Sequence, residues 1–409
     1  MLLLLLPSAV SGQFISVRDG MFWDGDREYR YVGTNFWYGA ILASEGRGGD
    51  RARLKKELDL MQKTGIDNVR VLVGGDGREG QASHIEPVLQ TAPGVYNDTI
   101  LRGLDYLMAE FEQRGMKAIL YFNNAWEWSG GYGTYLEWVT GHPAPIPSID
   151  GWPEYMSFVS DFVMNDEAVK LSSDHIRNIV TRRNTVTGQL YKDSPSLMAW
   201  EIANEPRCFV SDSVHKARLV DFIDSQSRLI KSLDPNHLVT TGSEGKHGCE
   251  QDISLFTRIH TLPCIDYACV HIWPYNWNWI KEKKDSINQL TLYYIEEAYN
   301  AMHPAGRPVV LEEFGYPRDG MRFEAGSPTT ERDAYFSYVF SIIRDSGKIA
   351  GCNFWGWGGL ADVRHVVWQR WDDYVGDPAQ EEQGLNSVFA KDRSTLHVIR
   401  TFSRELRKH

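Results

Sequence analysis

Short apolar segments alternate with longer amphipathic segments along the chain, a pattern that predicts strands followed by helices. Residues 50–64 are typical, because Leu54, Leu58 and Met61 repeat at helical spacing and Gly65 follows the last turn. The same pattern predicts helices at 99–114, 152–184, 214–232, 290–302, 330–346 and 394–406. It predicts strands at 29–33, 68–73, 117–122, 197–203, 238–241, 267–271, 309–313 and 351–355.

Strands that alternate with helices imply a parallel sheet with helical crossovers. Eight such units within 409 residues favour a closed (β/α)8 TIM barrel of the α/β class, with long loops at the face where the strands end. A doubly wound open sheet is the alternative, but no Gly-x-Gly-x-x-Gly turn follows the first strand. We therefore expect a single barrel domain over residues 13–409.

Catalytic groups of such barrels lie at the carboxyl ends of strands, where polar and aromatic residues gather in this sequence. Glu205 and Glu313 each end an apolar strand, and two carboxylates across a cleft suit acetal hydrolysis by a protonated and an ionised acid. Two structural acids that pair with Arg70 or a helix end are the weaker alternative. Other candidate site residues at strand ends are Asn35, Trp37, Arg70, Asn124, Trp126, Trp128, Asn204, His271, Trp273 and Trp355.

Two further acids stand beside this pair. Glu201 lies four residues before Glu205 and shares its face in a regular strand, whereas Glu312 precedes Glu313 and is expected on the opposite face. Only the outermost inward residue reaches a ligand, so we assign the chemistry to Glu205 and Glu313. We expect Glu312 to pair with a basic group between the sheet and the helices.

Composition and missing motifs narrow the class of ligand. A net charge of −11 disfavours nucleic acid and anionic membranes, while 14 Trp and 19 Tyr suit stacking on the apolar faces of sugar rings. The 12 histidines form no pair at metal-ligand spacing, and we expect neither a metal nor an organic cofactor. Motifs of serine hydrolases and phosphate-binding loops are missing as well. We expect a monomer that binds a polysaccharide or oligosaccharide.

Residues 1–12 combine a short apolar run with small residues, which is typical of the end of a secretory signal, and they predict a secreted protein. A plain apolar N-terminus is the alternative, since no basic residue precedes the run. The chain has five cysteines and no Cys-x-x-Cys pair. For an oxidising compartment we predict a bridge between Cys208 and Cys249, with Cys269 and Cys352 as buried thiols.

The sequence resembles glycoside hydrolase family 5, a family of retaining barrel hydrolases. The resemblance rests on WEIANEP at 200–206 and LEEFG at 311–315, with Arg70, His271 and Trp355 in the family's order. Three further segments resemble the family's β-mannan-degrading branch, which includes bacterial mannanases and exo-acting mannosidases. These segments are 33–38, 121–131 and 376–384.

The resemblance implies a role for several of these residues. Glu205 would be the acid/base and Glu313 the nucleophile, with Arg70 holding Glu313 ionised. Asn204 would bind the sugar 2-hydroxyl, His271 would contact the acid/base, and Trp355 would form the floor beneath the attacked sugar. Many members carry Tyr two residues after the His, whereas this chain has Trp273, which offers only an indole N–H; Tyr275 is a weaker substitute.

The implied activity is hydrolysis of β-1,4-mannosidic bonds in mannan or manno-oligosaccharides, as a mannan endo-1,4-β-mannosidase or an exo-acting relative. A β-1,4-glucan hydrolase of the cellulase type and a non-catalytic carbohydrate-binding barrel are the alternatives. The segment 358–384 after the last strand is long, and with the loop around Arg47 we expect it to wall off one end of the cleft. This expectation favours cleavage at a chain end or release of short products.

Overall fold

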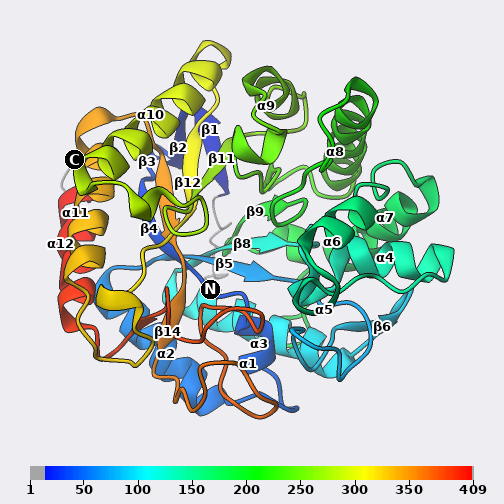
Figure 1. Ribbon diagram of the computed structural model, residues 1–409, viewed down its shortest axis with the longest axis horizontal. Coiled ribbons are helices and arrows are strands. Elements are labelled where there is room, and N and C mark those ends of the chain that lie inside the picture. Colours follow the sequence, from blue (N-terminus) through cyan, green and yellow to red (C-terminus); the bar gives the residue numbers. More distant parts are fainter. Residues whose placement is uncertain (1–13, 408–409) are drawn as a thin grey trace, which may run out of the picture.

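A computed structural model describes residues 14–407 of the chain. Within this range eight parallel strands form a barrel that helices surround (Figure 1). The barrel strands are β4 (Tyr31–Asn35), β5 (Asn68–Leu72), β8 (Lys117–Tyr121), β9 (Leu197–Glu201), β10 (Leu238–Thr240), β11 (Ala268–Ile272), β12 (Val309–Phe314) and β13 (Gly351–Phe354). The predicted fold class is confirmed, and each strand lies within two residues of its predicted bounds.

The strands follow one another around the barrel in the order in which they occur along the chain, so the loops after them meet at one rim. The hydrogen-bonded ladder runs from β10 through β9, β8, β5, β4, β13 and β12 to β11. At the seam between β10 and β11, the Thr240 hydroxyl donates to the Tyr267 carbonyl at 2.9 Å, and Asp266 N–H donates to the Val239 carbonyl at 2.8 Å. These bonds close the ring of strands.

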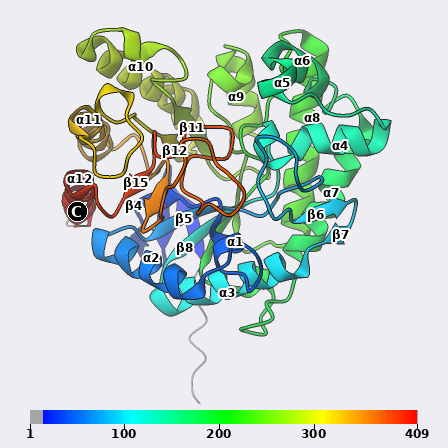
Figure 2. The same ribbon diagram turned by 60° about the horizontal axis from the view of Figure 1, so that its bottom comes forward.

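The helices bury apolar faces against the outside of the barrel (Figure 2). The predicted helix at 152–184 is two helices, because the Asn165 side chain accepts from Glu167 and Ala168 N–H at 3.1 and 3.0 Å and starts a new helix there. The helices are α1 (Gly39–Leu42), α2 (Arg51–Thr64), α3 (Asp98–Arg114), α4 (Gly131–Thr140), α5 (Pro147–Asp150), α6 (Trp152–Val159), α7 (Asp166–Val180), α8 (Ser213–Leu233), α9 (Ile253–His260), α10 (Lys284–Met302), α11 (Thr330–Ser346) and α12 (Arg393–Leu406). No helix in the described range is both long and apolar enough to cross a membrane.

A small antiparallel sheet, which the sequence analysis did not predict, precedes the barrel. It consists of β1 (Ile15–Arg18), β2 (Met21–Asp24) and β3 (Arg27–Glu28). Ile15 and Phe22 are buried in one cluster with Tyr31, Tyr267 and other residues at the starts of the barrel strands. The sheet therefore covers the amino-terminal end of the barrel and leaves the opposite rim for a site.

Two short strand pairs lie in the rim loops. They are β6 (Gln90–Ala92) with β7 (Val95–Tyr96), and β14 (Trp357–Gly359) with β15 (Val388–Phe389). The segment 360–387 between β14 and β15, orange in Figures 1 and 2, lies beside α1. Tyr374 in this segment packs against Trp37 with ring centroids 4.8 Å apart, which holds the segment over the barrel.

The predicted bridge between Cys208 and Cys249 is wrong for this structure, in which all five cysteines are free. The Cys208 thiol donates instead to the Val210 carbonyl at 3.2 Å, and Cys249 lies 3.9 Å from the Ser243 hydroxyl. Each sulfur therefore packs within its own loop. Cys269 and Cys352 are buried thiols, as predicted. The predicted signal segment, residues 1–12, lies outside the described residues and stays a prediction.

Candidate active site

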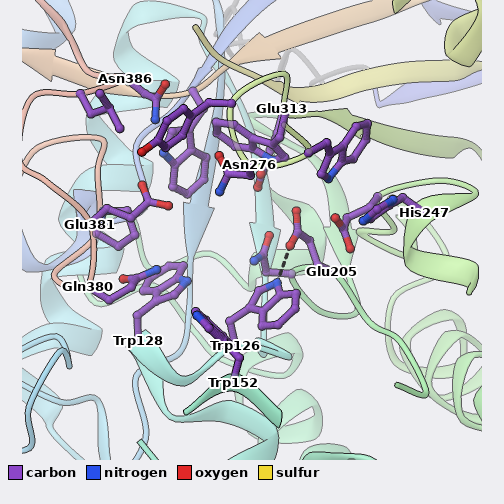
Figure 3. A pocket seen from close by; sticks show the side chains of 18 of the residues that line it. Trp126, Trp128, Trp152, Glu205, His247, Asn276, Glu313, Gln380, Glu381 and Asn386 are labelled. Atoms are coloured by element: carbon purple, nitrogen blue, oxygen red, sulfur yellow. Dashed lines mark hydrogen bonds between the residues drawn. The ribbon is translucent and has the colours of Figure 1, made fainter. Parts of the chain in front are cut away.

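A pocket of about 770 Å³ opens at the carboxyl ends of the barrel strands (Figure 3). This is the rim at which the sequence placed the site. Seven of the predicted residues line the pocket directly: Trp126, Trp128, Asn204, Glu205, Trp273, Glu313 and Trp355. The pocket joins carboxylates to aromatic faces, which is the combination that binds and cleaves sugars.

Glu205 stands just beyond β9 in a constrained backbone conformation. Its φ angle of 51° lies in the left-handed region, which costs a non-glycine residue free energy and is often found at functional sites. Glu205 N–H donates to the Gly242 carbonyl at 2.9 Å, and a Cβ on Gly242 would meet the Ala203 carbonyl oxygen. The close approach of these two loops turns the Glu205 side chain into the pocket.

Arg70 is a fully buried guanidinium that ties Glu313 to three other strands. It forms an ion pair with the Glu313 carboxylate, and its Nε donates to Glu201 at 2.8 Å. It also donates to the side-chain oxygens of Asn35 and Asn204, each at 2.9 Å. The side chain of Glu313 is thereby held in one orientation beside a permanent positive charge.

Glu312 contradicts the prediction that it faces the helices. Its carboxylate points into the barrel, 3.6 Å from His271 Nε2 and 3.9 Å from Arg70 Nε. The reason is a register shift between β11 and β12: Val270 pairs with Leu311 and His271 pairs with Glu313, so Glu312 is the extra residue of a bulge. The bulge interrupts strict alternation and brings two consecutive acids to the inside.

His271 links the two candidate catalytic acids. Its Nδ1 lies 2.6 Å from Glu205 and 3.3 Å from Glu313. Burial lowers the pKa of His271, which favours the neutral imidazole. One carboxylate oxygen of each acid and the ring nitrogen lie within 4.8 Å of one another. An approach this close is compatible with the carboxyl separation of about 5–5.5 Å in retaining glycosidases.

Five predicted residues support the pocket without lining it: Asn35, Trp37, Arg70, Asn124 and His271. Asn124 accepts from the backbone of Trp126 at 3.0 Å and from Asn204 at 3.1 Å, which fixes two residues that do line it. The Trp37 indole donates to the Gly376 carbonyl at 2.9 Å and packs on Trp128. These side chains act on a ligand only through their neighbours.

The pocket also holds residues outside the list of candidates, because they lie in loops or in α6 rather than at strand ends; among them is Tyr275, named above as a weaker substitute. Trp152 comes from α6 and His247 from the loop after β10, while Glu381 comes from segment 360–387. The others are Met156, Arg207, Glu244, Tyr275, Asn276, Trp277, Asn278, Lys281, Pro378, Gln380, Glu382, Leu385 and Asn386. The aromatic and amide content of these loops was the available signal.

Glu205, Glu313 and His271 also have the composition of a metal-ligand set. Each offers one donor atom to a common point. The guanidinium of Arg70 already contacts Glu313, however, and a dication at this point would face that positive charge. The trio is therefore better suited to holding and moving a proton.

A barrel with two close carboxylates in an aromatic rim pocket defines the class of barrel glycoside hydrolases. Within that class, residues 12–409 match the family model described as GH family 5 beta-mannosidase-like. The chain belongs to this family and is a glycoside hydrolase.

Proteins with similar sequences and structures support this assignment. Mannan endo-1,4-beta-mannosidase 7 of Arabidopsis thaliana is 30% identical over 97% of this chain and 86% of its own. The crystal structure of a glycoside hydrolase family 5 mannosidase from Rhizomucor miehei superposes with a TM-score of 0.88 at 30% identity, covering 97% of this chain and 98% of that one. An endo-1,4-beta-mannanase from the same organism gives a TM-score of 0.72 at 23% identity, over 97% and 100% of the two chains, and shows the fold alone.

Proposed function

We propose that this protein hydrolyses β-mannosidic bonds with retention of configuration, with Glu205 as acid/base and Glu313 as nucleophile. The observation that carries the proposal is the short spacing of the two acids, with only Glu313 in contact with Arg70. The names of the relatives support the choice of mannose as the sugar. A mutant of the Rhizomucor miehei mannosidase is recorded in complex with mannosyl-fructose.

Protonation of the two acids follows from their contacts. Burial raises the pKa of both carboxyls, and the negative charge of Glu205 raises that of Glu313 further. Because two acids this close resist double ionisation, the pair holds one proton in its resting state. We assign this proton to Glu205, because the Arg70 guanidinium is paired with the Glu313 carboxylate and not with that of Glu205. Glu205 then protonates the leaving oxygen while Glu313 attacks the anomeric carbon, and water completes the reaction after Glu205 becomes the base.

We further propose that cleavage occurs at the end of a sugar chain. Residues 378–386 line the side of the pocket opposite His247 (Figure 3). Gln380, Glu381 and Asn386 each have a buried side-chain oxygen without a protein partner in the described structure. Burial raises the pKa of Glu381 well above its usual range, so its carboxyl can both donate to and accept from sugar hydroxyls. A wall with unpaired polar groups suits a terminal sugar better than a chain that continues.

The wall differs from the one expected from the sequence. Arg47 does pack on Trp371, at 4.9 Å from its ring, and Arg370 pairs with Glu86 at 2.7 Å. Arg47 and Trp371 line a separate cavity, however, and not the catalytic pocket. The loop around Arg47 therefore braces segment 360–387 from outside, while residues 378–386 form the wall itself.

The experiment is a time course on mannohexaose and on 4-nitrophenyl β-mannoside, with cellohexaose and 4-nitrophenyl β-glucoside as controls. We expect release of mannose and mannopentaose first, with the β-anomer of mannose detected by NMR. Faster hydrolysis of the glucosides would favour the β-glucan alternative, and binding without turnover would favour the non-catalytic barrel. Early release of mannobiose and mannotriose would contradict chain-end cleavage alone.

A further inference from the structure

A second aromatic depression lies outside the catalytic pocket, between the loop after β11 and the start of α10. We call it the outer groove; it encloses about 670 Å³. Its lining combines apolar rings with amides and hydroxyls: Trp277, Asn278, Trp279, Glu282, Ser286, Gln289, Leu290 and Tyr293. Tyr293 is 63% exposed, so its ring is accessible to a ligand.

The outer groove adjoins the catalytic pocket. Trp277 and Asn278 line both cavities. On the pocket side, His247 stacks on Trp277 with ring centroids 4.6 Å apart. A sugar chain that leaves the pocket past His247 therefore reaches the outer groove next.

The position of the outer groove relative to Glu205 indicates which part of a substrate would bind in it. Residues 378–386 close the opposite side of the pocket, and His247 lies on the side of Glu205 (Figure 3). Glu205 is the group that protonates the leaving oxygen, so the leaving part of the substrate lies on its side. Sugar units beyond the cleaved bond are thus directed toward the outer groove.

Two aromatic side chains of the outer groove, Trp277 and Trp279, are held in place before any ligand binds. Trp277 packs edge-on against Trp279 at 5.0 Å and against Tyr294 at 5.2 Å. The Tyr294 hydroxyl donates to the Glu244 carbonyl at 2.8 Å, which fixes this ring to the barrel rim. Rigid aromatic faces lose little conformational entropy on binding, and such faces with neighbouring amides match the alternating apolar and hydroxyl surfaces of hexoses.

We infer that the outer groove binds the second and later sugar units on the leaving-group side of a β-linked mannose chain. The inference rests on the proposed function, because the direction of the chain depends on the role of Glu205. It adds a preference for long substrates to an enzyme that removes terminal sugars.

The test compares a substrate that is long enough to enter the outer groove with one that is too short. The double variant Trp279→Ala/Tyr293→Ala should lose about tenfold in kcat/KM on mannohexaose, mainly through KM. Hydrolysis of 4-nitrophenyl β-mannoside, which is too short to reach the groove, should stay within about twofold. The pair Trp279→Phe/Tyr293→Phe should keep most of the activity on the hexaose, since the stacking faces remain.

Matched controls separate groove binding from general damage. Tyr299→Ala removes a tyrosine from the same helix, where it stacks on His303 at 5.1 Å instead of lining the groove, and it should leave both substrates unaffected. If the double variant fails to fold, Tyr293→Ala alone carries the test, because this side chain is largely exposed. Equal kcat/KM of wild type and groove variants on mannohexaose overturns the inference, and so does an equal loss on both substrates by a folded variant.

A binding measurement keeps the inference apart from the proposed activity. The Glu313→Ala protein should be retarded in a native gel that contains soluble mannan, and the groove substitutions should abolish the retardation. Retardation by a soluble β-glucan alone would overturn the assignment of mannose and with it this inference. If neither polysaccharide retards the Glu313→Ala protein although the wild-type enzyme cleaves the aryl mannoside, the inference about the outer groove is overturned. The proposed function is then left intact.

Discussion

At the scale of residues, Glu205 and Glu313 differ in the groups that contact them, and the proposed chemistry depends on this difference. Glu313 meets the Arg70 cation, whereas Glu205 meets the Trp126 indole N–H and the neutral His271 ring. A cation stabilises an ionised carboxylate more than neutral donors do. These contacts support the proposed roles, in which Glu205 carries the proton and Glu313 is ionised.

Separate substitution of the two acids should separate their roles. Glu313→Ala should lose at least about 10⁴-fold in kcat on every substrate, because no covalent intermediate forms. Glu205→Ala should keep the first step on 2,4-dinitrophenyl β-mannoside, whose leaving group needs no proton, and azide should rescue its second step. Stopped-flow detection of dinitrophenol checks both. Identical behaviour of the two variants would contradict the assignment.

We expect the Trp126 indole to influence the upper pH limit of activity. Its N–H donates to Glu205 and lowers the pKa of that carboxyl against the rise that burial causes. Trp126→Phe removes the donor, so the pKa of Glu205 should rise and the acid should stay protonated to higher pH. The alkaline limb of the kcat profile on mannohexaose should therefore move to higher pH, while Trp23→Phe, on the far end of the barrel, should leave it in place. A shift to lower pH would disprove this account.

At the scale of elements, segment 360–387 is ordered by buried polar contacts rather than by regular structure. Asp377 accepts from the backbone N–H of Gly384 and Asn386, both at 2.9 Å. Arg332 donates to the Leu385 carbonyl at 2.6 Å. This network holds residues 378–386 against the pocket, although they belong to no helix or strand.

Arg318 joins this segment to the start of α12, because it donates to the Gly384 carbonyl at 3.1 Å and forms an ion pair with Asp392. Both side chains are fully buried, and the guanidinium donates to the two carboxylate oxygens at 2.8 and 2.6 Å. Asp392→Asn leaves a buried cation unpaired and should lower the free energy of unfolding by about 3–5 kcal/mol. Urea denaturation followed by fluorescence measures this change. Asp362→Asn, at an exposed pair with Arg364, is the control and should cost less than about 1 kcal/mol.

At the scale of the whole molecule, residues 378–386 line one side of the pocket and the outer groove adjoins the other, where Trp277 and Asn278 line both cavities. The first side would select a chain end, while the second would accept a long remainder. Under the proposed function, an enzyme of this shape would shorten polysaccharides from their ends.

The viscosity of soluble mannan reports on this asymmetry. Removal of terminal sugars hardly changes the chain length, so viscosity should fall slowly for each reducing end released. Viscometry with a parallel reducing-sugar assay gives the ratio, and an endo-acting mannanase is the reference. A rapid fall in viscosity with few new reducing ends would show that chains pass through the pocket uninterrupted.

The sequence by itself determined the barrel and the place of the chemistry. Its alternating pattern predicted every barrel strand, and the carboxyl ends of parallel strands meet at one rim, so Glu205 and Glu313 had to lie near each other. Periodicity carries this information because each strand is short, apolar and followed by its own helix. The resemblance to family 5 agreed with the match of residues 12–409 to the family model.

Only the tertiary structure decided what regular periodicity does not encode. The bulge in β12 turned Glu312 inward, and the loop contacts left Cys208 and Cys249 as separate thiols. Residues 378–386 and the loop part of the outer groove, residues 277–282, lie in segments without period. Their positions depend on buried hydrogen bonds and aromatic packing between distant parts of the chain. Hydrogen bonds and packing over such separations arise only when the barrel has formed, so sequence pattern locates the acids but not the walls around them.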